Sequence, residues 1–169
     1  MENFAERLVA RLNGRAWMGV ARAKGGQRMG KLSQESTSGG ILLVEDDQPV
    51  ANALAYLLRT AGYPVDLAYN GREALEKVAA GEYELIICDV RMPVMDGEAF
   101  YRELRCSHPS LSQRIVFCTG DPDNPGTRRL LKTSGVPFIR KPFRLGAVLE
   151  VVSERFVSRS CWAEPAHSM

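Results

Sequence analysis

Long apolar segments are missing from this chain of 169 residues. No apolar run approaches the roughly 20 residues that a membrane span requires. No hydrophobic core of a secretory signal follows the first methionine, and Glu2 and Glu6 argue against an organelle transit peptide. We therefore expect a cytoplasmic protein without a transmembrane segment.

Motifs for zinc and for redox chemistry are missing as well. The four cysteines show no CxxC spacing; they are Cys88, Cys106, Cys118 and Cys161. This excludes the usual zinc and dithiol motifs and favours reduced thiols in the core. The two histidines, His108 and His167, have no partner motif, so we assign them no chemistry.

Positive charge is concentrated at the N-terminus. The net charge is +2, yet residues 1–40 contain seven Lys or Arg and three Glu. Phe4, Leu8 and Leu12 have helical spacing among these cations, so a basic amphipathic segment that touches a membrane surface, nucleic acid or a partner is one interpretation. The simpler one is a flexible extension over residues 1–38, or the end of something longer, whose Gly- and Ser-rich part is a linker.

The remainder predicts one α/β domain over residues 39–157 and a C-terminal tail over residues 158–169. Apolar runs and amphipathic segments alternate five times, which indicates a parallel sheet covered by helices on both faces. The expected strands cover residues 41–44, 65–69, the run before Asp89, 114–118 and 136–140. The expected helices begin near Pro49 and Asn70 and cover about 98–106, 127–135 and 145–157.

Polar side chains follow four of these strands. Glu45, Asp46 and Asp47 follow the first, Asp89 the third, Thr119 the fourth and Lys141 the fifth. An aspartate after a strand is often only a turn residue or helix cap, but in an open parallel sheet the strand ends also form the ligand crevice. Clustered carboxylates call for a hard cation such as Mg²⁺, and a lysine and a hydroxyl beside them suit phosphoryl transfer to Asp89.

These residues carry a family resemblance. The motifs are Glu45-Asp46, Asp89 followed by Met92-Pro93 and Asp96-Gly97, Thr119, and Lys141-Pro142-Phe143. Asp46, Thr119 and Lys141 lie 43, 30 and 52 residues from Asp89. The ordered set resembles the receiver domain of bacterial two-component response regulators over about residues 39–157. The resemblance implies a flavodoxin-like, doubly wound sheet of five parallel strands in the order 2-1-3-4-5 with five helices.

The resemblance also implies roles. Asp89 would accept a phosphoryl group, and Mg²⁺ would bind directly to Asp46 and Asp89, through water to Glu45, and to the backbone carbonyl of Arg91. Lys141 would pair with Asp89 and then with its phosphate, often beside a cis peptide bond to the following proline. Asp47, the third acid, is more simply a helix cap.

Thr119 would donate to a phosphate oxygen and move inward, and Phe138 would turn inward with it. This two-state switch would change the surface around the fourth helix, the fifth strand and the fifth helix. Plain packing is the alternative for Phe138, which is a phenylalanine where many members have tyrosine.

Arg91 and Asp121 lie two residues beyond Asp89 and Thr119. We predict that their opposite charges pair over the acyl phosphate and slow its hydrolysis. The alternative is two solvated side chains, because exposed pairs contribute only about 0 to 1 kcal/mol.

By resemblance, the partner is a histidine kinase or a histidine phosphotransfer protein, and the downstream target is another protein. We expect a phosphoacceptor domain that promotes its own phosphorylation and dephosphorylation rather than an enzyme, with no output domain in the chain. It resembles a single-domain receiver or the C-terminal receiver of a hybrid sensor kinase. A phosphorylation-independent adaptor or a tail-driven nucleic-acid binder is the competing hypothesis. The complete acidic set argues against a degenerate receiver, and a net charge of +4 over 40 residues is thin evidence for DNA binding.

Overall fold

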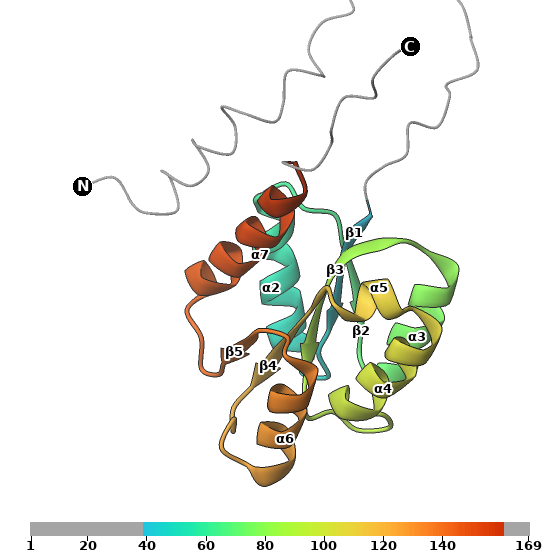
Figure 1. The fold of residues 1–169 in the computed structure, drawn as a ribbon. Coiled ribbons are helices and arrows are strands. Elements are labelled where there is room, and N and C mark those ends of the chain that lie inside the picture. Colours follow the sequence, from blue (N-terminus) through green and yellow to red (C-terminus); the bar gives the residue numbers. More distant parts are fainter. Residues whose placement is uncertain (1–38, 161–169) are drawn as a thin grey trace, which may run out of the picture. The chain divides into compact units, whose positions relative to one another are not determined.

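The computed structural model describes residues 39–160, which form a five-stranded parallel sheet with the order β2-β1-β3-β4-β5 (Figure 1). The strands are β1 (Gly40–Val44), β2 (Val65–Ala68), β3 (Tyr83–Asp89), β4 (Ile115–Thr119) and β5 (Phe138–Arg140). The predicted fold class and strand order are therefore confirmed. The expected basic extension and most of the expected C-terminal tail lie outside the described residues.

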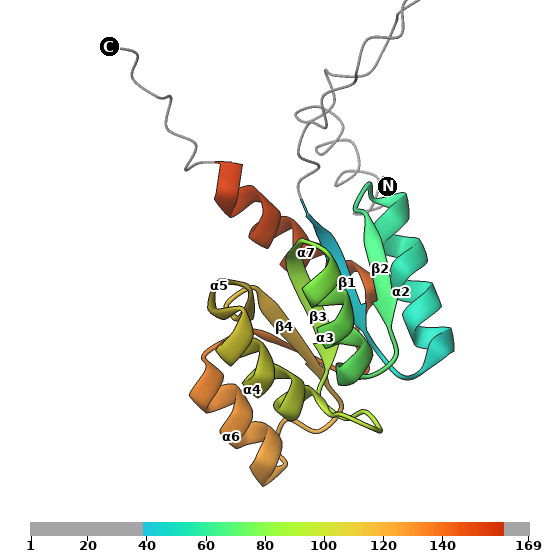
Figure 2. The same cartoon turned by 90° about the vertical axis from the view of Figure 1, so that its right-hand side faces the viewer.

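Helices cover both faces of the sheet. They are α2 (Gln48–Thr60), α3 (Gly71–Ala80), α4 (Gly97–Ser107), α5 (Pro109–Ser112), α6 (Pro125–Ser134) and α7 (Leu145–Ser160). Figure 2 shows α2 and α7 on one face and α3 and α4 on the other, where Leu130 of α6 also packs. This two-sided cover is the doubly wound arrangement that a parallel sheet requires.

The strands are buried on both faces. Leu42, Ile86 and Phe117 pack toward α3 and α4 and are inaccessible to solvent. Leu43 and Ile87, one residue further along, point to the opposite face and are also buried. Burial on both faces explains why the strands are continuous apolar runs without polar alternation.

The prediction of five helices was wrong, because the described residues contain six. The additional helix, α5, is a single turn of four residues after His108. Pro109 cannot continue α4, since its ring lacks an N–H and clashes with the preceding turn, but it is well suited to the first position of a new helix. A single turn is too short to produce a periodic apolar pattern.

Two predicted boundaries near the C-terminal half were also displaced. Helix α6 begins at Pro125 rather than near Thr127, because the Asn124 side chain accepts hydrogen bonds from the backbone N–H groups of Gly126 and Thr127. The Asn-Pro pair is thus a helix cap and first residue rather than part of a turn. Strand β5 begins at Phe138 rather than at residue 136.

Side-chain caps fix the start of the first two described helices, which begin close to the expected positions near Pro49 and Asn70. Asp47 accepts from the backbone N–H of Val50 at 3.2 Å. Asn70 accepts from the N–H groups of residues 72 and 73, and Glu73 accepts in return from the N–H of Tyr69 at 2.9 Å. These caps satisfy N–H groups that have no partner inside the helix.

Candidate functional site

The two central strands deliver the acidic residues to one edge of the sheet. Val44 of β1 is paired with Cys88 of β3, so Glu45 and Asp89 follow next to each other at the carboxyl ends of adjacent strands. Carboxylate oxygens of Glu45, Asp46 and Asp89 all lie within 4.8 Å of one another. The first is 2% exposed and the last 8%, whereas Asp46 is exposed. Three predicted metal ligands are thus brought together.

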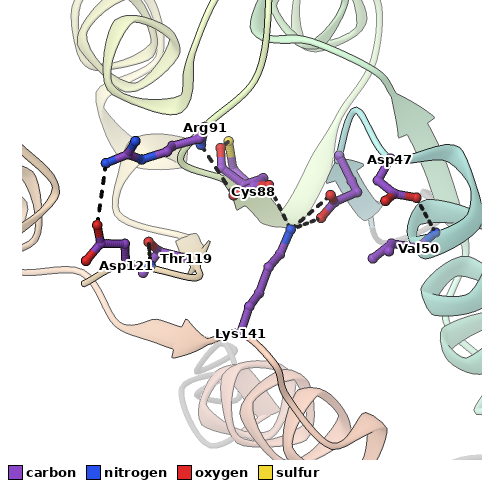
Figure 3. A network of polar contacts seen from close by, with 9 residues as sticks. Asp47, Val50, Cys88, Arg91, Thr119, Asp121 and Lys141 are labelled. Carbon is purple, nitrogen blue, oxygen red and sulfur yellow. Dashed lines mark hydrogen bonds and ion pairs between the residues drawn. The ribbon is translucent and has the colours of Figure 1, made fainter. Parts of the chain in front are cut away.

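Lys141 connects two of these carboxylates. Its ammonium lies 2.7 and 2.9 Å from the two oxygens of Glu45 and 2.7 Å from Oδ2 of Asp89 (Figure 3). The lysine follows β5, and its backbone N–H donates to the carbonyl of Thr119 at 2.7 Å. The expected cis peptide bond joins it to Pro142. The predicted pairing of Lys141 with Asp89 is therefore confirmed.

Burial and charge shift the pKa values of this group. Burial raises the pKa of Glu45 above its ordinary 4.5; the hydrogen bond from Lys141 opposes this shift and the charge of Asp89 adds to it. Burial lowers the pKa of Lys141, but the hydrogen bonds to Asp89 and Glu45 outweigh that effect and raise it above 10.5. The ammonium thus stays charged and holds two carboxylates that otherwise repel each other.

Thr119 and Arg91 lie on the side of Lys141 away from Asp47 (Figure 3). Thr119 is buried, and its hydroxyl accepts from the backbone N–H of Asp121 at 3.1 Å. The backbone N–H of Arg91 donates to Oδ1 of Asp89 at 3.3 Å. The Arg91 guanidinium lies 3.8 Å from the carboxylate of Asp121, with side chains 60% and 58% exposed. The pairing of the two charges is confirmed; its position over an acyl phosphate and its effect on hydrolysis stay predictions.

Phe138 lies outside the acidic group. It is the first residue of β5, and 46% of it is exposed. It lines a groove of about 750 Å³ with the apolar Leu131 and Val136 and the basic Arg128 and Arg140. In this structure the ring is therefore in the outward position, and its proposed inward turn stays a prediction.

The cysteines beside the site are buried thiols. Burial raises the pKa of Cys88 well above its ordinary value, and burial raises that of Cys118 to about 12. Cys88 pairs with Phe117 and Cys118 with Asp89, so the two thiols point to opposite faces of the sheet. Neither forms a disulfide, and neither is a thiolate nucleophile near neutral pH.

Two features of the site were missed in the sequence. The contact of Lys141 with both oxygens of Glu45 has no sequence signal, because it depends on the spatial approach of segments 96 residues apart. Gly97 lies against the acidic strand: a Cβ placed there would be 2.5 Å from the carbonyl oxygen of Asp89. The Asp96-Gly97 pair was a signal for this close approach, and Asp96 also caps α4 by accepting from the N–H of Ala99 at 2.8 Å.

The donor set suits a hard divalent cation. Three carboxylates with oxygens this close repel each other, and one ammonium balances only part of their charge. Carboxylate oxygen is the ligand that Mg²⁺ prefers in proteins, usually from one or two acids plus waters and phosphate oxygens. The residues present therefore fit a magnesium ion.

The family model described as "Response regulator receiver domain" matches residues 41–153 of this chain. The chain belongs to this family of receiver domains. The match covers all of the sheet except Gly40 and extends into α7, and it contains all four strand ends that form the acidic site.

Curated relatives of this receiver domain are larger signalling proteins. The chain is 35% identical over 130 residues to the sensor kinase CckA of Brucella abortus, an alignment that covers 76% of this chain and 14% of CckA. It is 37% identical over 113 residues to the transcriptional regulatory protein ZraR of Escherichia coli, which covers 65% of this chain and 25% of ZraR. The chain thus spans a quarter or less of the length of these two relatives.

Solved receiver structures have the same fold. Chemotaxis protein CheY4 of Vibrio cholerae is 29% identical with a TM-score of 0.62, covering 69% of this chain and 98% of CheY4. The signal receiver domain of a histidine kinase from Syntrophus aciditrophicus is 29% identical with a TM-score of 0.66, covering 78% and 98%. TrrA of Thermotoga maritima, solved in complex with Mg²⁺ and BeF, is 28% identical with a TM-score of 0.60, covering 69% and 98%.

Between residues 39 and 160, the receiver domain has no helix with the length and apolar character needed to cross a membrane.

Proposed function

We propose that this receiver domain takes part in a phosphorelay, in which Asp89 accepts a phosphoryl group from a phosphohistidine of a histidine kinase or histidine phosphotransfer protein. One observation carries the proposal: three carboxylates and the ammonium of Lys141 converge at one edge of the sheet. Asp89 is the acid that the ammonium, a neighbouring backbone N–H and the other carboxylates all face.

The transfer forms one bond and breaks one. A carboxylate oxygen of Asp89 attacks phosphorus, the P–N bond to the donor imidazole breaks, and the departing nitrogen keeps the electron pair. A magnesium ion held by Glu45, Asp46, Asp89 and the Arg91 carbonyl would supply positive charge to the phosphoryl oxygens. Lys141 moves its hydrogen bond from Asp89 to a phosphate oxygen, and the hydroxyl of Thr119 donates to another.

The product of this reaction is the modified protein itself. The acyl phosphate on Asp89 is removed when water attacks phosphorus and the carboxylate leaves. The domain therefore promotes its own phosphorylation and dephosphorylation, and it converts no separate substrate. This supports the role of a phosphoacceptor rather than that of an enzyme in the usual sense.

The response to phosphorylation passes through Thr119. When its hydroxyl turns to the phosphate, its hydrogen bond from the Asp121 N–H is lost and the β4–α6 loop is released. The Thr119 carbonyl holds Lys141, and Arg140 is paired with Thr119 across the sheet. The groove beside Phe138 is lined by this loop, α6 and β5. We infer that this groove is the surface that changes for a downstream protein.

A second candidate rests on the basic composition of residues 1–40, with seven Lys or Arg and three Glu. An adaptor or nucleic-acid binder of this kind would work without phosphorylation. Salt-dependent retention on duplex DNA that is lost when residues 1–40 are deleted supports this candidate, because phosphate contacts are weakened by salt. Salt-independent behaviour removes it.

Labelling by acetyl phosphate or by a phosphorylated kinase in the presence of Mg²⁺ tests the main proposal. We expect Asp89→Asn to abolish labelling. We expect Asp46→Asn to abolish the increase in labelling that Mg²⁺ produces. Asp47→Asn is the matched control, since Asn caps a helix as well as Asp and the residue lies outside the acidic group. Labelling of Asp89→Asn at the wild-type level contradicts the proposal.

A further inference from the structure

Val94 has an unfavourable backbone conformation. Its φ is 69°, and within residues 39–160 no other residue except glycine has a positive φ. A β-branched side chain in this left-handed region collides with its own backbone, which costs on the order of 1–2 kcal/mol. Such strain persists only where the surrounding structure enforces it.

The residues on both sides of Val94 enforce this strained backbone conformation. The N–H of Met95 donates to the carbonyl of Pro93 at 2.8 Å, and the carbonyl of Met95 accepts from the N–H of Gly71 at 3.0 Å. Met92 is buried in the core before the turn, and Asp96 caps α4 directly after it. The loop cannot relax without breaking these contacts.

The strained side chain has little contact inside the described structure. Val94 is 79% exposed, which is the largest value among the exposed large apolar residues of the described part; the other two are Tyr56 and Phe138. Glycine or asparagine at this position would adopt the same backbone with less strain. An outward-facing apolar side chain is therefore held here against a stability cost, with little packing inside the described structure to offset it.

The position of the Val94 side chain, close in sequence to the phosphoacceptor, indicates a role in contacts with a partner. Val94 lies five residues beyond Asp89, in the loop that begins with Arg91 at the edge of the acidic site. Any protein that brings a phosphohistidine to Asp89 must cover this edge, whereas a small donor need not reach Val94. A valine loses little rotamer freedom on contact, so it is well suited to a docking surface.

We propose that Val94 is a docking residue for the protein phosphodonor and contacts an apolar patch next to the donor's phosphohistidine. This inference rests on the proposed function of Asp89. It predicts that Val94 contributes to transfer from a protein and contributes nothing to transfer from acetyl phosphate.

Three variants test the contribution of the apolar side chain to transfer, and thermal unfolding reports the strain. Val94→Gly and Val94→Asn remove both, so we expect a higher thermal midpoint and transfer from a protein donor slowed about tenfold, as expected for one lost apolar contact. Val94→Ile keeps both and should behave like the wild type. Labelling by acetyl phosphate should be unchanged in all three.

The protein donor is chosen from a panel of purified sensor kinases that includes CckA of Brucella abortus without its own receiver. The kinase that labels the wild type fastest is used. Wild-type transfer rates in Val94→Gly and Val94→Asn overturn the docking role and leave the proposed function intact. An equal loss with acetyl phosphate also overturns it, because the residue then acts on the acidic site. If no kinase labels the wild type, the partner in the proposed function is wrong and the inference fails with it.

Discussion

Lys141 is the residue that joins the chemistry of the acidic site to the rest of the sheet. Its ammonium bonds to Glu45 and Asp89, and its backbone bonds to Thr119. Under the proposed function, a divalent cation held by the carboxylates would supply positive charge in place of the ammonium on Glu45. The ammonium of Lys141 would then be available to a phosphoryl group on Asp89, whereas in this structure it holds the two carboxylates.

The pair of Arg91 and Asp121 should affect the lifetime of the acyl phosphate. We expect Arg91→Ala to shorten it by a few fold, since an exposed pair contributes at most about 1 kcal/mol. Phosphate release after removal of the donor measures this lifetime. Asp121→Ala should have a similar effect, and the double variant should add little.

Arg128→Ala is the control, because Arg128 forms a similarly exposed pair with Asp123 at 3.3 Å on the groove side of the loop. A lifetime in Arg91→Ala equal to that of the wild type removes the predicted role.

Tyr83 should make stability depend on alkaline pH. Its hydroxyl donates to Asp66 at 2.8 Å; burial, this hydrogen bond and the charge of Asp66 raise its pKa from 10.0 to about 12. A raised pKa gives stability that is present below pH 10 and is lost as pH rises toward 12. We expect Tyr83→Phe to lower the free energy of unfolding at neutral pH and to lower it less at about pH 11. Urea unfolding at both pH values checks this, and an effect that grows with pH contradicts it.

Long buried elements and their ends could be predicted from the sequence. The run before Asp89 is recognisable as a strand because it is continuously apolar, which matches the burial of β3 on both faces. The start of α3 is recognisable because Asn70 and Glu73 have the spacing of the cap that they form. Both signals are local. The single turn of α5 and the early start of α6 were missed because their prolines are equally compatible with turns.

Only the part of the acidic site that follows from the order of the strands could be predicted. Adjacent parallel strands bring Glu45 and Asp89 together once the order of the strands is known. Which carboxylates Lys141 contacts could not be predicted, because it depends on the path of the loop after β5. The strain at Val94 also has no sequence signal, since the tightness of that turn is set by tertiary contacts with Gly71.

The start of α3 should depend on one side chain. Asn70→Ala leaves two backbone N–H groups without their acceptor, so we expect a loss of about 1 kcal/mol in the free energy of unfolding. Chemical denaturation measures it. Asn52→Ala, at an exposed position inside α2, is the control and should not lower stability, because Ala is the better helix former. Equal effects of the two variants contradict the capping role.

In the molecule as a whole, the site and the groove are connected by a short path. Arg140 lines the groove and is covalently joined to Lys141, whose ammonium bonds to Asp89. The β4–α6 loop forms a second connection, from Thr119 through Asp121 to the groove. Under the proposed function, a charge change at Asp89 would reach the groove through these two connections, each only a few residues long.

Magnesium should stabilise the whole domain. A ligand that binds the folded state alone adds about 2.7 kcal/mol when its free concentration is 100 times its dissociation constant. We expect the thermal midpoint to rise with Mg²⁺, and Asp46→Asn to lose most of this rise because it removes a carboxylate from the acidic group. Sodium chloride at matched ionic strength is the control. A midpoint that rises equally with both salts contradicts a specific site.

Gly97 has a consequence for how this domain tolerates mutation. Any side chain at that position would push into the carbonyl of Asp89 or the Cα of Val90, and so displace the acidic strand end. In a saturation library selected for signalling, position 97 should accept as few replacements as position 89, although glycine contributes no reactive group. Sensitivity to replacement would then mark a spatial neighbour of the phosphoacceptor rather than a participant in its reaction.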